Sequence, residues 1–218
     1  MKWNKIIYIL IVVLMASTLP AYEKSALARL HYDGGGDWYN DQDIIPNIAE
    51  FLNETLDTDF ALIEESVKPS ESKLFDYPFI FATGHGNISF NEKEASNLRK
   101  YMDRGGFLLV DDDYGLDKSF RKEVKKIFPE KDLVELPASH PLFHCYFDFP
   151  NGIPKTHKHD DKRPQAFAIF DKIGRLQLLY LYESNITDGW SDAHDDPPEI
   201  RQEAMQMGAN IIYYLMTQ

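Results

Sequence analysis

The chain has 218 residues, of which 44% are hydrophobic and 13% aromatic. This composition excludes a disordered protein and allows a domain of ordinary size with a substantial core. The formal net charge is −12, which opposes binding to nucleic acid or to an anionic membrane, because both depend on clustered Lys and Arg.

The N-terminal segment has the pattern of a secretory signal. Lys2 and Lys5 precede an apolar run over residues 6–16, and small or helix-breaking residues follow as far as Ala21. The run is shorter than the about 20 residues that span a bilayer. We therefore expect a signal peptide over residues 1–21 and export to the periplasm or the exterior. Cleavage after Ala28 and an uncleaved signal anchor are the alternatives. There is no further integral membrane domain in this prediction.

Residues 22–218 are predicted to form a single α/β domain, because strand-like and helix-like patterns alternate. In the first half the predicted strands are Ala26–Tyr32, Ala61–Glu64 and the continuously apolar Phe79–Thr83. Helical spacing covers Asp43–Thr55 and Asn91–Arg104. In the second helix Asn91 and Glu94 are three residues apart, as in a capping box.

The second half continues this alternation. Strands are predicted at Phe107–Val110, Ala166–Phe170 and Leu176–Tyr182, with a turn at Asp171–Arg175 joining the last two. Helices are predicted at Asp117–Ile127 and from Pro197 to Leu215, whereas residues 140–162 are rich in proline and look irregular. The whole pattern predicts a mostly parallel sheet flanked by helices on both faces.

Three predicted strand ends carry unusual residues, and ligands of open α/β sheets bind at the carboxyl ends of strands. We therefore expect a ligand site there, built from the residues Gly34, Gly35, Gly36, Asp37, Trp38, Gly84, Gly86 and Tyr114. The alternative is that the glycines only make tight turns. The sequence after Gly34–Gly36 excludes a nucleotide P-loop, since no Gly-Lys-Ser/Thr follows.

Carboxylates and imidazoles near the same strand ends are candidates for general acid–base chemistry. Asp111, Asp112 and Asp113 are consecutive, and carboxylates held together raise one another's pKa. We select Asp112 and Asp113, together with His85 or His144, as candidate catalytic residues. The alternative is that one aspartate caps the next helix or turn while another binds loop backbone.

Further histidines indicate a divalent metal as a cofactor. His140 and His144 are four residues apart, although Pro141 makes their geometry uncertain, and His157 and His159 face the same way in an extended chain. All four are candidate metal ligands, and the alternative is a solvated polar loop.

A further loop over the site is expected after the last strand. It carries Glu183, Asp188, Trp190, Asp192 and His194, although Trp190 could equally be a packing anchor. Cys145 is the one cysteine of the chain, so no intramolecular disulfide forms, and its aromatic neighbours predict a buried thiol.

Several stretches together resemble the bacterial family called domain of unknown function 4159. They are residues 29–39 (RLHYDGGGDWY), 106–115 (GFLLVDDDYG), 140–144 (HPLFH) and 207–214 (MGANIIYY). The resemblance implies a flavodoxin-like fold similar to class I glutamine amidotransferases. The nucleophilic cysteine of those enzymes follows a strand at a glycine-flanked elbow. Here the matching strand, Phe107–Val110, ends in aspartates, so the resemblance implies no glutamine hydrolysis.

The sequence therefore predicts a cell-envelope module that binds a small molecule or an envelope protein and lacks the amidotransferase nucleophile. The alternative is a hydrolase, metal-dependent or not, that uses the aspartates and histidines of the sheet edge. A third reading treats the unusual loops as ordered for stability alone.

Overall fold

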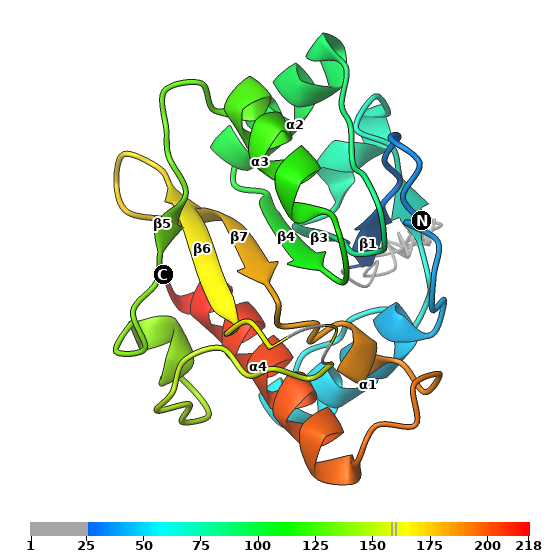
Figure 1. Ribbon diagram of the computed structural model, residues 1–218, viewed down its shortest axis with the longest axis vertical. Helices are drawn as coiled ribbons and strands as arrows, with labels where there is room; N and C mark the ends of the chain where they lie inside the picture. Colours follow the sequence, from blue (N-terminus) through cyan, green and yellow to red (C-terminus); the bar gives the residue numbers. More distant parts are fainter. Residues whose placement is uncertain (1–25, 158, 160) are drawn as a thin grey trace, which may run out of the picture.

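A computed structural model describes residues 26–157, 159 and 161–218 of the chain (Figure 1). The signal peptide predicted over residues 1–21 lies outside the described residues. Within the described part, no helix combines the length and the apolar character needed to cross a membrane.

The centre of the fold is a seven-stranded sheet with the strand order β2-β1-β3-β4-β7-β6-β5. Its strands are β1 (Leu27–Leu30), β2 (Ser66–Val67), β3 (Phe79–Ala82), β4 (Phe107–Asp112), β5 (Val134–Glu135), β6 (Gln165–Phe170) and β7 (Leu176–Tyr182). The first five strands in this order run parallel, and β6 and β5 are antiparallel additions at one edge. The predicted mixed α/β fold with a mostly parallel sheet is confirmed at this level.

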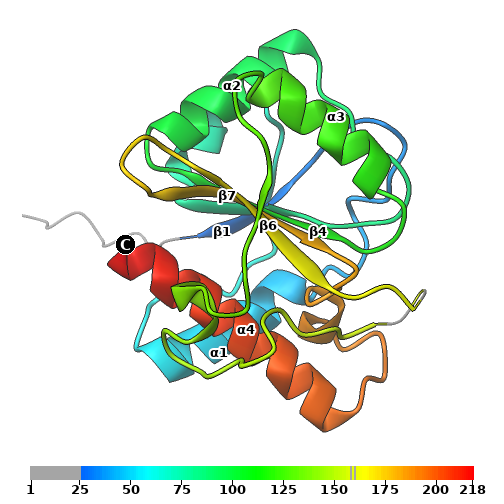
Figure 2. The same ribbon diagram turned by 60° about the vertical axis from the view of Figure 1, so that its left-hand side comes forward.

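Helices cover both faces of the sheet, as Figure 2 shows. The α-helices are α1 (Ile44–Leu56), α2 (Glu92–Asp103), α3 (Asp117–Ile127) and α4 (Pro198–Thr217). Short 3-10 helices are η1 (Ser72–Asp76), η2 (Pro141–Phe143) and η3 (Asp188–Trp190). α2 and α3 pack side by side on one face, and α1 and α4 pair on the other.

Two hydrophobic cores lie on opposite sides of the sheet, because successive strand residues point to opposite faces. In β3, Phe79 and Phe81 belong to the core under α1 and α4, whereas Ile80 and Ala82 belong to the core under α2 and α3. A strand that is buried on both faces must be apolar throughout, which explains the uninterrupted run of β3.

Most predicted elements agree with the structure to within a few residues. The capping box at the start of α2 is confirmed: the Asn91 side chain accepts from the Glu94 amide, and the Glu94 side chain accepts from the Asn91 amide. The turn between β6 and β7 is also confirmed, with a 2.9 Å bond from the Asp171 amide to the Arg175 carbonyl.

One predicted strand is wrong and one strand was missed. Ala61–Glu64 is not a strand; instead Ser66 and Val67 pair with β1. The apolar residues Leu62 and Ile63 that suggested the strand are exposed. β5 carried no hydrophobic signal because both of its residues are exposed.

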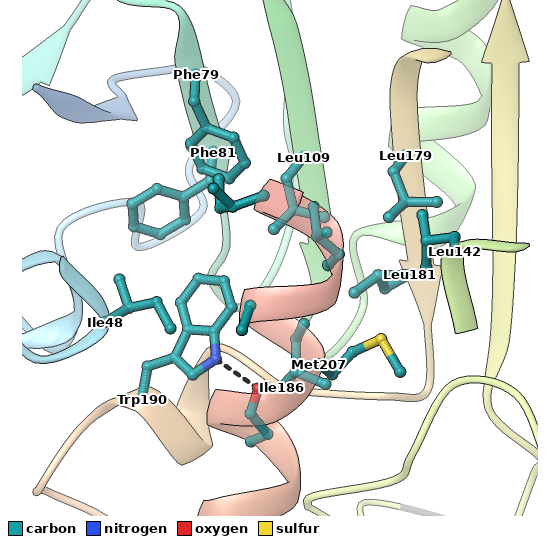
Figure 3. Close-up of a cluster of buried hydrophobic side chains, with 14 of the residues drawn as sticks. Ile48, Phe79, Phe81, Leu109, Leu142, Leu179, Leu181, Ile186, Trp190 and Met207 are labelled. Carbon is teal, nitrogen blue, oxygen red and sulfur yellow. Dashed lines mark hydrogen bonds between the residues drawn. The ribbon is translucent and has the colours of Figure 1, made fainter. Parts of the chain in front are cut away.

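Trp190 is the packing anchor of the loop after β7 (Figure 3). Its ring lies beside Ile48 of α1 and Phe81 of β3 and is almost fully buried. Its indole N–H donates to the Ala204 carbonyl at 2.9 Å. η3 is thereby fixed against the core, and η3 also carries Asp188.

Candidate metal centre

Four loops meet at the carboxyl edge of the parallel strands. The loop after β1 carries Asp37, the loop after β3 carries His85, the end of β4 leads into Asp113, and the loop after β7 leads into Asp188. β1 and β3 are neighbours in the sheet, and their following helices, α1 and α2, lie on opposite faces. A crevice at such a switch point is the usual ligand site of open α/β sheets.

Glycines allow the loops after β1 and β3 to approach one another closely. A Cβ on Gly84, whose φ is +133°, would lie 2.6 Å from the Tyr32 hydroxyl and 2.8 Å from Oδ1 of Asp37. The Gly36 amide donates to the Asn87 carbonyl at 2.9 Å, and the Gly86 amide donates to the Tyr114 carbonyl at 2.9 Å. These two amides bond to protein rather than to a ligand, so here the glycines serve to dock the loops.

The three consecutive aspartates have three different environments, because alternate residues of a strand face opposite ways. The Asp112 carboxylate accepts from the amides of Leu116 at 2.8 Å and Asp117 at 3.0 Å, so it caps the start of α3. Asp111, on the other face, accepts from the amide and hydroxyl of Thr187. Asp113 alone of the three is directed at the histidines of the neighbouring loops.

Asp113 is the centre of a group with two histidines. Its side chain is 1% exposed; Oδ2 lies 3.0 Å from Nδ1 of His85, and Oδ1 lies 3.2 Å from Nε2 of His159. One ligand atom from each of the three residues lies within 4.8 Å of the other two. Asp37 lies next to this group, with Oδ2 3.1 Å from Nδ1 of His85 and Oδ1 accepting from the His85 amide.

A second group consists of His157, Asp188 and His194, and its ligand atoms also lie within 4.8 Å of one another. Asp188 is almost fully buried, and the two histidines are partly exposed. Nε2 of His194 lies 4.0 Å from Oδ1 of Asp188 and 2.9 Å from Oδ2 of Asp41.

Buried carboxyl groups lie close together at this edge of the sheet. Burial raises the pKa of Asp188 to about 9, and the nearby carboxylates of Asp113 and Asp111 contribute to this increase. Burial likewise raises the pKa of Asp111 to about 7. Buried carboxylates with raised pKa values can be stabilised by protons or by a cation.

Arg29, which the sequence analysis did not single out, holds the loop after β1 in place. Its buried guanidinium donates to the carbonyls of Trp38 at 3.2 Å and Asp41 at 2.8 Å, and to Oδ1 of Asn40 at 3.3 Å. It also forms a 2.6 Å ion pair with Glu64. The sequence did contain a signal for this role, because Arg29 is a charged residue within an otherwise apolar strand pattern.

The structure places some predicted site residues elsewhere. His144 contacts Asp148 at 2.5 Å and the Ala138 carbonyl at 2.8 Å, both within its own segment. His140 caps η2 by accepting from the Leu142 amide. Neither belongs to the two groups. The structure thus does not bring His140 and His144 together with His157 and His159. Pro141 starts a 3-10 turn, so His140 and His144 are not presented on one face of an α-helix.

Other predicted residues have packing roles or line the site. Trp38 stacks on His31 with ring centroids 3.8 Å apart. Tyr114 is exposed, and its ring centroid lies 5.0 Å from that of His159. Cys145 is only half-buried rather than fully buried, and burial raises the pKa of its thiol.

A cavity of about 260 Å³ opens beside Asp113. Its lining comprises Asp112, Asp113, Tyr114, Gly115, Asp117, Lys118, Lys162, Tyr182 and Glu183. A larger cavity, of about 610 Å³, lies between α1 and α4 and includes none of the six ligand residues. The smaller cavity is the one that adjoins the candidate centre.

Fold and site together define an α/β protein with two Asp–His groups at the carboxyl edge of a mostly parallel sheet. The chain belongs to the family described as "Domain of unknown function (DUF4159)", whose model matches residues 26–216. A comparison with curated proteins finds no match.

Proposed function

We propose that this protein is a metal-dependent hydrolase whose ion is held by His85, Asp113 and His159. The observation that carries the proposal is the convergence of these three side chains, from three separate segments, on one point with ligand atoms within 4.8 Å. Two imidazoles and a carboxylate are a frequent ligand set of catalytic zinc, and three protein ligands leave a coordination position open.

The surrounding residues have roles that suit hydrolysis. A metal bound at such a site lowers the pKa of a coordinated water to about 7. Asp37 is next to His85 and partly exposed, so it can accept a proton from a water molecule or add a fourth ligand. Asn185 donates to Oδ1 of Asp113 at 3.2 Å and to its carbonyl at 3.0 Å, which fixes the orientation of this carboxylate.

The substrate would occupy the cavity of about 260 Å³ beside Asp113. Its rim combines the exposed Tyr114 and the ammonium group of Lys118 with several carboxylates. This lining favours a polar substrate. A sugar or a peptide-like compound of the cell envelope fits the export that we infer from the N-terminal segment.

We also infer a flavodoxin-like fold similar to that of class I glutamine amidotransferases. The five parallel strands have the order β2-β1-β3-β4-β7, which corresponds to the flavodoxin-like order 2-1-3-4-5. β4 leads into Asp111, Asp112 and Asp113 rather than a cysteine. This supports a reaction other than cysteine-dependent glutamine hydrolysis.

The test uses the purified full chain, stripped with a chelator and reloaded with Zn²⁺, Mn²⁺ or Co²⁺. Hydrolysis of chromogenic esters, phosphodiesters, glycosides and amino-acid anilides is measured with and without metal. We expect at least one class to be hydrolysed only with metal, and Asp113→Asn to abolish this hydrolysis while His144→Ala retains it. Metal binding without hydrolysis of any class would contradict the hydrolase and support a non-catalytic binding module. Activity that is unchanged in Asp113→Asn would exclude the proposed site.

A further inference from the structure

We propose that His157, Asp188 and His194 form a second cation site, so that the centre holds two ions rather than one. The inference concerns metal binding and does not require the proposed hydrolysis. It rests on geometry, on unpartnered buried atoms, and on the position of this group beside the first.

The geometry is that of a three-ligand site drawn from two segments. His157 comes from the irregular region before β6, and Asp188 and His194 come from the loop after β7. Nε2 of His194 is 4.0 Å from Oδ1 of Asp188, and all three ligand atoms lie within 4.8 Å of one another. An ion at about 2 Å from each atom would fit between them.

The second observation is that two of the three residues each carry a buried side-chain atom without a hydrogen bond. Among the described residues, neither Oδ1 of Asp188 nor Nδ1 of His157 has a hydrogen-bond partner. Asp188 is 2% exposed. A buried polar atom that lacks a partner destabilises the folded state, and an ion coordinated by these atoms would remove this cost.

Packing and hydrogen bonds also hold the loop after β7 in one position. η3 is anchored by Trp190, and the amide next to Asp188, that of Thr187, donates to Asp111 at 2.8 Å. Asp188 is therefore held at the edge of the sheet rather than free to turn to solvent. Preorganised ligands of this kind bind metal with less loss of conformational freedom.

The two groups are contiguous. His157 and His159 are two residues apart, and their ring centroids are 5.3 Å apart. Asp113 and Asp188 are both buried, and each belongs to a different one of the two groups. Each group therefore supplies one buried carboxylate to an ion of its own.

The ligands define the class of ion. Two imidazoles with one carboxylate favour Zn²⁺, Mn²⁺, Fe²⁺, Co²⁺ or Ni²⁺ over Ca²⁺ and Mg²⁺, which prefer oxygen ligands. Two further carboxylates border the group: Oδ2 of Asp41 is 2.9 Å from Nε2 of His194, and Oδ1 of Asp196 is 3.8 Å from Nδ1 of His157. Oδ2 of Asp196 is also buried without a hydrogen-bond partner in the described part of the chain.

The test is a count of ions per chain. The full chain is stripped, titrated calorimetrically with Zn²⁺, desalted, and analysed by elemental mass spectrometry. We expect two ions for the unaltered chain and for the control His144→Ala, and one ion each for His194→Ala and His85→Ala. Co²⁺ absorption of the two single-site variants should differ, because each reports a different ligand set. Far-ultraviolet circular dichroism checks that each variant folds, and His157→Ala serves if His194→Ala does not.

One ion in the unaltered chain, or two ions in folded His194→Ala and His157→Ala, would overturn the second site. The outcome is separable from the proposed function. Two ions without hydrolysis contradict the hydrolase alone. One ion, lost in His85→Ala together with hydrolysis, contradicts the second site alone.

Discussion

Nε of Arg29 donates to Oε1 of Glu64 at 2.6 Å, and the same guanidinium donates to the Asp41 carbonyl at 2.8 Å. This ion pair joins β1 to the segment before β2 and at the same time holds the loop that carries Asp37 and Asp41. The buried charge therefore positions residues at both Asp–His groups without belonging to either.

The first prediction concerns the Arg29 clamp, by which we mean the four hydrogen bonds of the Arg29 guanidinium. Arg29→Lys keeps the charge but cannot reproduce four divergent hydrogen bonds, so we expect the free energy of unfolding to fall by about 2–3 kcal/mol. Urea denaturation measures this. The matched control is Arg163→Lys, which retains an ion pair with the exposed Glu135 and should change stability by less than about 1 kcal/mol. Equal effects of the two substitutions would show that the clamp is not important for stability.

The second prediction separates steric clash from backbone strain at glycine. Gly84→Ala and Gly105→Ala both place a side chain at positive φ, +133° and +111°. Only at Gly84 would the new Cβ also lie within 3 Å of Tyr32 and Asp37; at Gly105 it would have no described neighbour within 4 Å. Gly105→Ala should cost about 1 kcal/mol, and Gly84→Ala clearly more, with weaker metal binding. Thermal unfolding compares them, and an equal loss would refute the close approach.

The third prediction assigns different roles to adjacent aspartates. Asp112→Asn replaces one of two accepting oxygens at the start of α3, so it should lower stability by about 1 kcal/mol and leave the ion count unchanged. Asp113→Asn should lower the ion count. Denaturation and elemental analysis of both variants provide the measurement. A loss of metal in folded Asp112→Asn would place the catalytic role on Asp112 instead.

The fourth prediction is that metal stabilises the folded chain. At 100 times its dissociation constant, an ion contributes about 2.7 kcal/mol, which corresponds to a rise in Tm of roughly 6–10 °C for a domain of this size. In Asp113→Asn, the part of this rise that comes from the first site should be absent. In His144→Ala, both sites should still raise the Tm. Differential scanning calorimetry with chelator as reference measures it. An unchanged Tm in the unaltered chain would argue against a centre in the folded state.

The fifth prediction concerns two histidines outside the centre, which have opposite pKa shifts. Burial lowers the pKa of His140, so the folded state resists its protonation and stability falls as the pH drops below 6.5. The hydrogen bond with Asp148 raises the pKa of His144, so its contribution is full below 6.5 and is lost as the pH rises through the folded-state pKa.

Unfolding at pH 5 and pH 8 tests both signs. His140→Asn should lose less stability than the unaltered chain on going from pH 8 to pH 5, and His144→Asn should lose more. Parallel pH profiles for all three proteins would contradict both assignments.

Periodicity was sufficient to predict the helices and the long strands, because α1 to α4 each bury one face and β3 buries both. It failed at β2 and β5, which are two residues long and are defined by pairing with neighbours rather than by their own side chains. A site was expected at the strand ends, and His85 and Asp113 lie close together there, since parallel strands bring their carboxyl ends to one edge.

The members of the cluster were harder to predict. His85, Asp113, His157 and His159 were selected, but Asp188 and His194 entered only as residues of a covering loop. The loop that carries them passes through left-handed backbone at Glu183 and Asn185 and contains the buried Trp190. His140 and His144 were selected because they are four residues apart. This spacing places two side chains on the same side only within a regular α-helix. The spacing of residues along the chain does not determine the direction in which an irregular loop runs.

The two Asp–His groups draw on residues 85, 113, 157, 159, 188 and 194, which belong to four separate segments. The chain contains one cysteine and therefore forms no intramolecular disulfide. Coordinated ions at this edge would act as reversible cross-links among these segments, tying the loop after β7 to β3 and β4. Metal supply would then set the susceptibility of these loops to proteolysis as well as any chemistry that they perform.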